Sequence, residues 1–349
     1  MTGHPLLPTD APVSLLDTAE TAIDGELAVE LYRRMVLARR FNRQATALTL
    51  QGRLSVYPSS AGQEAVAAAV TLALAEEDWL FPTYRDTAAV VLRGVDPVQA
   101  VTLLRGDWHH GWDPGAHRVA PLATPLATQT AHAVGLAHAA ALAGDDLAVL
   151  ALIGDGGTSE GDFHEAVNLA AVFRSPVVFL VQNNGYAISV PLSRQSAAPS
   201  LAHKGIGYGV PGVLVDGNDA LAVHRVVDEA LTRARRGGGP SLIEARTYRI
   251  DPHTNADDAT RYRADEEVAE ARRRDPLPRL ERHLRERGLL DDATVRAASV
   301  AAEALAAVLR DRLADEPRPD PADLFTHVYA TTPPHVAEQR RVLTGEAGR

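Results

Sequence analysis

Three short, unbroken apolar runs constrain the fold of this chain more than any other feature of its sequence. They are LAVLALI (147–153), PVVFLVQ (176–182) and SLIEA (241–245), each bounded by Gly, Pro, Asp or Asn. Stretches with helical spacing separate them. Such runs are typical of parallel strands that are buried on both faces of a sheet. The pattern predicts an α/β fold with a doubly wound, mostly parallel sheet flanked by helices.

Helices are expected on both sides of these strands. The apolar spacing from Leu27 predicts a long helix that Gly52 ends, and residues 62–75 form a second, Ala-rich one. Another is predicted from Thr124-Pro125, with proline at its first position, to Gly144. Residues 276–314 follow a helical pattern broken at Gly288. The fold therefore carries a helical N-terminal arm and a helical C-terminal extension.

The chain is expected to hold one main domain between two terminal segments. We assign residues 1–25 to a loose arm, 26–330 to the α/β domain and 331–349 to a tail, after the linker-like stretch 314–323. A length of 349 residues with 46% hydrophobic content can build a core of this size.

Composition excludes several classes of function. The chain has no cysteine, so it can form neither disulfides nor a thiolate metal site. A net charge of −10 argues against nucleic acid as a partner. No apolar stretch approaches the ~20 residues that span a bilayer. The first residues lack a basic start followed by an apolar run, so we expect a cytoplasmic protein without membrane contact.

Chemistry is concentrated where two of the predicted strands end. The run 147–153 leads into Gly154-Asp155-Gly156-Gly157, followed by a helix whose N-terminus suits a phosphate. Asp155 would repel that phosphate unless a cation lay between them, and Mg²⁺ favours this arrangement. The run 176–182 ends at Asn183-Asn184-Gly185-Tyr186, which brings amide and carbonyl oxygens to the same edge of the sheet.

Each of these motifs alone is an ordinary turn sequence. Their combination is more specific, because thirty residues and one strand–helix–strand unit separate Gly154 from Asn184. A nicotinamide-binding Rossmann enzyme is the competing interpretation. It needs Gly-x-Gly-x-x-Gly after the strand, and GDGGTSEG (154–161) lacks that spacing.

The chain resembles the alpha chain of thiamine-diphosphate-dependent 2-oxoacid dehydrogenases over roughly residues 30–330. Gly154-Asp155-Gly156 with Asn183-Asn184 looks like the family's thiamine diphosphate fingerprint. YAIS (186–189) makes the branched-chain members look most similar. The further motifs that carry the resemblance are GDGGTSEGDFHEAVNLA (154–170), FPTYRDTA (81–88), TPLATQ (124–129), VDGNDALAV (215–223) and TYRIDPHTNADDATRYR (247–263).

The resemblance implies a role for each matching residue. The magnesium ligands would be Asp155, Asn184 and the Tyr186 carbonyl. The thiamine diphosphate would be contacted by Tyr84, Arg85, Leu126, Gly154, Asp155, Gly156, Gly157, Asn184, Tyr186 and His253. Arginine suits this task because its planar fork binds phosphate at two points. Leu126 would hold the bent cofactor, although a core leucine fits the sequence nearly as well.

His253 would be the catalytic residue, in a polar loop after a strand, where it helps acyl transfer. The roles of His109 and His110 stay open. So does phosphorylation of Thr254, which stands where animal relatives carry a phosphoserine.

Several positions depart from the family pattern. Thr83 and Gln182 replace a glutamine and an arginine, so we expect fewer side-chain contacts to the diphosphate. Ala123 replaces a serine of the segment that binds K⁺ in animal relatives, whereas Pro125, Thr128 and Gln129 remain. A potassium site is therefore left open.

The resemblance also implies the reaction and the partners. The chain would oxidatively decarboxylate a 2-oxoacid and transfer the acyl group to a lipoyl domain of an acyltransferase. No glutamate in a matching context is present to activate the cofactor ring, so a beta chain would complete the site, as an α2β2 assembly.

Two alternatives to a branched-chain substrate remain. The same chemistry on pyruvate or acetoin is one, and pocket residues such as Val56 and Tyr57 would decide it. A degenerate, non-catalytic thiamine-fold binding module is the other, and the intact motifs argue against it.

Overall fold

A five-stranded parallel sheet forms the centre of the computed structural model, which describes residues 6–18, 24–106, 111–315, 320–326 and 328–345. The strand order is β1-β2-β3-β7-β6. The strands are β1 (Trp79–Phe81), β2 (Val149–Gly154), β3 (Val177–Asn183), β6 (Gly212–Asp216) and β7 (Ser241–Arg246). The predicted parallel sheet flanked by helices is confirmed. Strands β1 and β6 lie at the two edges, and their short runs were not predicted.

Side chains alternate between two hydrophobic cores, one on each face of the sheet. In β2, Leu150 and Leu152 belong to one core, whereas Val149, Ala151 and Ile153 belong to the other. Successive side chains of a strand point to opposite faces. Because both faces are buried, every residue of the strand has to be apolar.

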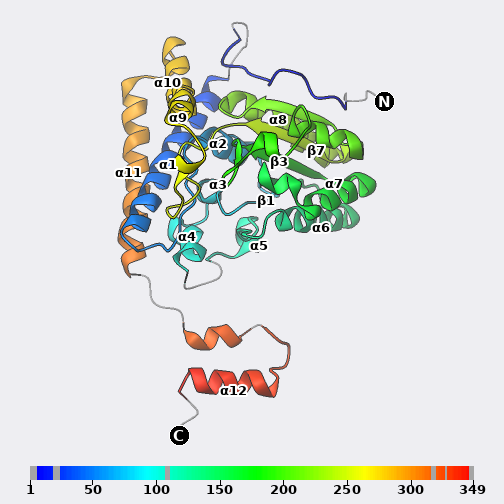
Figure 1. Cartoon of the computed structure of the whole chain (residues 1–349), viewed down its shortest axis with the longest axis vertical. Helices are drawn as coiled ribbons and strands as arrows, with labels where there is room; N and C mark the ends of the chain where they lie inside the picture. Colours follow the sequence, from blue (N-terminus) through cyan, green and yellow to red (C-terminus); the bar gives the residue numbers. More distant parts are fainter. Residues whose placement is uncertain (1–5, 19–23, 107–110, 316–319, 327, 346–349) are drawn as a thin grey trace.

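Different helices cover each face (Figure 1). Helices α6 (Thr128–Ala143) and α7 (Gly161–Phe173) pack on the face that holds Val149. On the opposite face, α2 (Glu64–Ala73) packs against α8 (Ala220–Arg233), and α1 (Gly25–Leu50) lies outside α2. The doubly wound arrangement leaves the carboxyl ends of the strands free to form a site.

Further helices extend this framework. The long helix α1 begins at Gly25, two residues before the predicted Leu27, where Asp24 accepts hydrogen bonds from the backbone N–H groups of Glu26 and Leu27. It packs against α11 (Asp292–Asp315), and Gly288, at a φ of +69°, lies in the predicted break before α11. These helices are α3 (Thr87–Leu92), α4 (Pro97–Arg105), α5 (Pro114–His117), α9 (Asp265–Arg273), α10 (Pro276–Glu286) and α11 (Asp292–Asp315).

The predicted start of the helix at Thr124-Pro125 is wrong. Helix α6 begins at Thr128, after Ala127 in the left-handed conformation with a φ of +65°. The Ala127 carbonyl accepts bonds from the N–H of Thr130 at 2.9 Å and from its hydroxyl at 2.5 Å. This tight turn holds residues 124–127 as a loop, which leaves Leu126 outside the helix.

Both terminal segments contain ordered contacts. Val13 pairs with Val215 of β6, and the backbone N–H groups of Leu15 and Leu16 donate to Asp219 at 2.6 and 2.7 Å. Part of the segment expected to be loose is thus held against the domain. Near the C-terminus, η6 (Pro321–Phe325) contacts α12 (Pro334–Leu343), and Figure 1 shows both apart from the α/β body. The proposed domain boundaries stay predictions.

No helix in the described part of the chain combines the length and the apolar character needed to cross a membrane.

Candidate functional site

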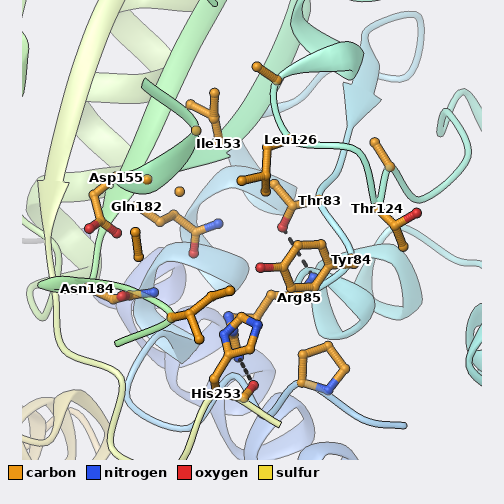
Figure 2. Close-up of a pocket in the computed structure, with 18 of the residues that line it drawn as sticks. Thr83, Tyr84, Arg85, Thr124, Leu126, Ile153, Asp155, Gln182, Asn184 and His253 are labelled. Carbon is orange, nitrogen blue, oxygen red and sulfur yellow. Dashed lines mark hydrogen bonds between the residues drawn. The ribbon is translucent and has the colours of Figure 1, made fainter. Parts of the chain in front are cut away.

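A cavity of about 480 Å³ lies at the carboxyl ends of β1, β2, β3 and β7. Figure 2 shows side chains from all four strand ends around it. Every residue predicted to contact the cofactor or metal lines this cavity: Tyr84, Arg85, Leu126, Gly154, Asp155, Gly156, Gly157, Asn184, Tyr186 and His253. The parallel strand order brings together positions that are up to 169 residues apart, from Tyr84 to His253.

The glycine-rich turn after β2 is closely packed at two of its three glycines. A Cβ on Gly156 would lie 2.6 Å from the Cβ of Ala187, and one on Gly157 would lie 2.7 Å from Ile153 Cγ1. A Cβ on Gly154 would meet nothing within 4 Å. Packing therefore explains Gly156 and Gly157, whereas the space beside Gly154 is free for a ligand.

Oxygen donors gather on one side of the cavity. Asp155 is only 1% exposed, and its carboxylate accepts one side-chain bond, from Gln195 Nε2 at 3.0 Å. It forms no ion pair within the described residues, and burial raises its pKa. Asn184 lies nearby in Figure 2, and the backbone carbonyl of Tyr186 follows it in the same turn.

This donor set fits a magnesium ion that also binds a diphosphate. Mg²⁺ is usually bound by one or two protein carboxylates together with substrate phosphates. Asp155 is the single carboxylate of the set, and no cluster of three or more His, Asp or Glu that could hold a metal occurs among the described residues. The unpaired, buried carboxylate would be compensated by a cation at this place.

Arg85 provides positive charge in the same cavity. Its Nη1 donates to the Ser59 carbonyl at 2.7 Å and to the His253 carbonyl at 3.2 Å, and its Nη2 donates to His253 Nδ1 at 2.9 Å. The guanidinium also lies 5.6 Å from the centre of the Tyr84 ring. An anion between Arg85 and an ion bound at Asp155 would be attracted from two sides.

The two arginines beside His253 determine its protonation. Its Nδ1 lies 2.9 Å from Arg85 Nη2 and 3.3 Å from Arg249 Nη1, and an arginine can only donate. Nδ1 must therefore accept, which assigns the proton of the neutral ring to Nε2. Burial, with the charges of Arg85 and Arg249, lowers the pKa of His253 to about 4. The imidazole is neutral near pH 7.

A network under the His253 loop was missed by the sequence reasoning. Arg249, 1% exposed, donates to the Ile188 carbonyl at 2.7 Å and to the Tyr262 hydroxyl at 2.9 Å. The Tyr262 hydroxyl donates to Asp257 at 2.5 Å, and Asp257 also accepts from the His253 N–H at 2.7 Å. Apart from Ile188, these residues belong to the motif 247–263, so that motif was the signal, but the individual partners needed the structure.

The departures Thr83 and Gln182 both line the cavity, and both side chains bond to Asp86, at 2.6 Å each. Asp86 is 6% exposed. Burial raises its pKa, while the bonds from Thr83 and Gln182 lower it.

Of four further candidates, three line the cavity and one does not. Leu126 is 45% exposed and lines the cavity, so it is not a core leucine. Val56 and Thr254 also line it. Tyr57 is instead 2% exposed, and its hydroxyl lies 3.2 Å from Thr87 Oγ1 outside the lining.

His109 and His110 lie outside the described residues.

Comparisons with known proteins point in one direction. The family model described as "Dehydrogenase E1 component" matches residues 32–315. The chain is 46% identical over 336 residues to the 3-methyl-2-oxobutanoate dehydrogenase subunit alpha of Mycobacterium tuberculosis, covering 95% of this chain and 92% of that protein. It is 42% identical over 272 residues to the pyruvate dehydrogenase E1 component subunit alpha of Staphylococcus aureus, covering 77% of this chain and 73% of that protein.

Proposed function

Since the chain belongs to the dehydrogenase E1 component family, we propose that it oxidatively decarboxylates a 2-oxoacid and passes the acyl group to a lipoyl domain. It is a 2-oxoacid dehydrogenase of the alpha-subunit type, and a branched-chain 2-oxoacid is the favoured substrate. The greater identity and coverage of the 3-methyl-2-oxobutanoate dehydrogenase relative support this choice. Pyruvate is the second candidate, which the pyruvate dehydrogenase relative supports. The observation that carries the proposal is the convergence of all the predicted site residues on one cavity.

Thiamine diphosphate is the cofactor of the family, and when bound it supplies the electron sink for decarboxylation. We propose that Asp155, the Asn184 amide oxygen and the Tyr186 carbonyl would hold a Mg²⁺ ion that neutralises charge on the diphosphate. The support is the buried carboxylate without an ion pair in the described part of the chain, together with neighbouring neutral oxygen donors.

The remaining residues would bind and orient the cofactor. Arg85 and the backbone of the glycine-rich turn would hold the diphosphate. Leu126, exposed in the cavity, would pack against the body of the cofactor. Tyr84 stacks near Arg85 and would restrict the position of its guanidinium.

His253 would act in proton control near the reacting atoms. With Nδ1 occupied by Arg85 and Arg249, the group that it can offer to a substrate or lipoyl thiolate is Nε2–H. A neutral imidazole that donates from Nε2 can stabilise developing negative charge and can transfer that proton.

A potassium ion beside the cavity is a further part of the proposal. The Gln129 side chain is 3% exposed, and its Nε2 donates to the Leu152 carbonyl at 2.8 Å. Its Oε1 is buried without a hydrogen-bond partner in the described part of the chain. An unsatisfied buried oxygen is costly, and a cation would satisfy it. Stabilisation by K⁺ but not by Na⁺ in a thermal melt would support this ion.

We propose a beta chain as the partner that completes the site. Glu160 is the one glutamate among the described residues that line the cavity, and it is exposed, three residues after Gly157. The outer side of α6 and α7 supports a partner, because it exposes apolar side chains: Leu142 at 76%, Leu169 at 45%, Val172 at 67% and Phe173 at 50%. An α2β2 assembly and a lipoyl-bearing acyltransferase belong to the same proposal. Cytoplasmic location stays a prediction.

The proposed function is tested by a decarboxylation assay with the beta chain present. Pyruvate, 2-oxobutyrate and the three branched-chain 2-oxoacids are compared by kcat/KM. The highest value for a branched-chain acid is expected. A preference for pyruvate would select the second candidate. Absence of turnover on all of them, together with no binding of thiamine diphosphate and Mg²⁺ in calorimetry, would favour a non-catalytic binding module.

A further inference from the structure

A chain of hydrogen bonds connects the metal side of the cavity with the Arg85 side. Asn184 Nδ2 donates to Gln63 Oε1 at 3.3 Å, and Gln63 Nε2 donates to Gln182 Oε1 at 2.9 Å. Gln182 Nε2 then donates to Asp86 Oδ1 at 2.6 Å. We call Asn184, Gln63, Gln182 and Asp86 the amide chain. None of its side chains is more than 6% exposed, so each polar group needs its partner within the protein.

Asp86 fixes the direction in which these bonds run. Its Oδ2 accepts from the N–H of Thr83 at 2.7 Å and from Thr83 Oγ1 at 2.6 Å. The N–H of Arg85 donates to Thr83 Oγ1 at 3.2 Å, so the hydroxyl keeps its own proton for Asp86. Asp86 thus accepts both Thr83 bonds at Oδ2, and its Oδ1 lies 2.6 Å from Gln182 Nε2. Gln182 turns its NH₂ group toward Asp86.

Each amide passes this constraint to the next. Because the NH₂ group of Gln182 donates to Asp86, its carbonyl oxygen faces Gln63. Gln63 must therefore donate its own NH₂ group to that oxygen. The Gln63 carbonyl then faces Asn184, which must also donate its NH₂. The amide oxygen of Asn184 is left on the other side, where the Tyr186 N–H contacts it at 3.3 Å. A reversed Asn184 would direct two N–H donors at the cation.

We propose that Asp86 is a positioning residue that acts through Gln182 and Gln63 to keep the amide oxygen of Asn184 turned toward the metal. This inference rests on the proposed function, because it assumes the magnesium site. It also gives a role to Gln182 and Thr83, the positions that depart from the family pattern, because both bond to Asp86 and so help to orient the Asn184 amide. Partners that orient a metal ligand commonly affect metal affinity about 10–100-fold.

The first experiment measures Mg²⁺ binding by calorimetry on the full-length chain, with its beta chain and saturating thiamine diphosphate. Asp86→Asn is expected to weaken Mg²⁺ binding about 10–100-fold, since an asparagine can donate as well as accept and no longer imposes a direction. Gln182→Met, which interrupts the amide chain without changing a charge, is expected to give a similar loss and covers the case in which Asp86→Asn does not fold. Asp216→Asn is the matched control, because this carboxylate ends β6 and bonds Arg279 at 2.6 Å outside the cavity lining.

A second experiment distinguishes an effect of hydrogen-bond direction on Mg²⁺ affinity from an effect of added negative charge. In the Asp86→Asn background, Gln63→Glu introduces an acceptor next to Asn184, which must again donate its NH₂. Mg²⁺ affinity should recover in this double variant by more than Gln63→Glu raises it on its own. A simple charge effect would raise affinity equally in both backgrounds.

Three results would overturn the inference or its premise. Wild-type Mg²⁺ affinity in folded Asp86→Asn and Gln182→Met variants would remove the positioning role. Equal gains from Gln63→Glu in both backgrounds would remove the directional argument. If the wild-type protein bound neither thiamine diphosphate nor Mg²⁺, the proposed function itself would fail, and with it the site that the amide chain serves.

Discussion

Among single residues, Asp155 combines deep burial with the absence of an ion pair in the described part of the chain. Asp155→Asn should abolish Mg²⁺-dependent binding of thiamine diphosphate, because a neutral amide replaces the charged ligand. The cofactor-free variant should melt at or above the wild-type temperature, since an uncompensated buried charge is removed. Calorimetry and thermal melts measure the two effects. Unchanged cofactor affinity would refute the metal assignment.

Asp78→Asn is a matched control for this change. Asp78 is also fully buried, but it pairs with Arg235 at 2.5 Å and accepts from the N–H of Ala148 at 2.8 Å. Its replacement should lower the melting temperature and leave cofactor affinity unchanged, the reverse of Asp155→Asn.

His253 offers a second test at this scale. His253→Ala should spare cofactor binding and slow reductive acylation of the lipoyl domain by about 10²–10⁴-fold, the usual contribution of an acid–base group. Stopped-flow acylation and calorimetry give the two quantities. Acyl transfer at the wild-type rate would show that the histidine is structural.

The depressed pKa of His253 predicts a pH dependence of stability for the cofactor-free protein. The folded pKa is about 4, below the ordinary value of 6.5, so between these values the unfolded chain binds more protons than the folded one. The contribution of His253 is fully present above pH 6.5 and is lost as pH falls toward 4. Denaturant melts of His253→Gln should therefore decline less steeply than wild type across this window. Parallel curves would contradict the assigned pKa.

At the scale of elements, the glycine-rich turn and the β4–β5 hairpin, β4 (Tyr186–Ala187) with β5 (Val190–Pro191), depend on each other's position. Gly156→Ala would place a Cβ 2.6 Å from the Cβ of Ala187, which has no flexible side chain to move. The hairpin that carries Tyr186 must then shift. We expect at least a ~10-fold loss of cofactor affinity with the domain still folded, as for partners that orient a metal ligand.

Gly154→Ala is the natural comparison, because its Cβ would meet nothing within 4 Å. It should leave the melting temperature of the cofactor-free protein unchanged. If thiamine diphosphate approaches the Gly154 backbone as proposed, the affinity for this cofactor should fall while the melting temperature does not. A loss of stability in Gly154→Ala would contradict the open space beside it.

For the whole molecule, the expected behaviour is inactivity in isolation. The cavity of this chain provides the candidate metal and diphosphate contacts. The exposed apolar side chains of α6 and α7 form the surface proposed to bind the beta chain. The purified chain, saturated with thiamine diphosphate and Mg²⁺, should show no substantial decarboxylation with an artificial electron acceptor. Addition of the beta chain should restore it. Turnover by the single polypeptide would refute the shared site.

The sequence by itself determined the parallel sheet and the strand ends at which the candidate site residues lie. Buried parallel strands must be apolar on both faces, so 147–153, 176–182 and 241–245 were recognisable, and the polar residues that follow them had to meet at one edge. The edge strands β1 and β6 lacked this signal, because β1 has three residues and β6 has three apolar residues between Gly212 and Asp216. The start of α6 was predicted wrongly because alanine favours helices, and nothing in the local sequence indicates that Ala127 adopts the left-handed conformation.

Only the tertiary structure decided which side chains orient the site. The tautomer of His253 depends on Arg85, 168 residues away, and the amide of Asn184 depends on Gln63, 121 residues away. Such contacts arise from the strand order, which places β1 and β7 on opposite sides of β2 and β3 and directs their carboxyl ends to one cavity. Local sequence patterns encode the elements, whereas hydrogen-bond direction is a property of groups that meet only after the sheet has formed.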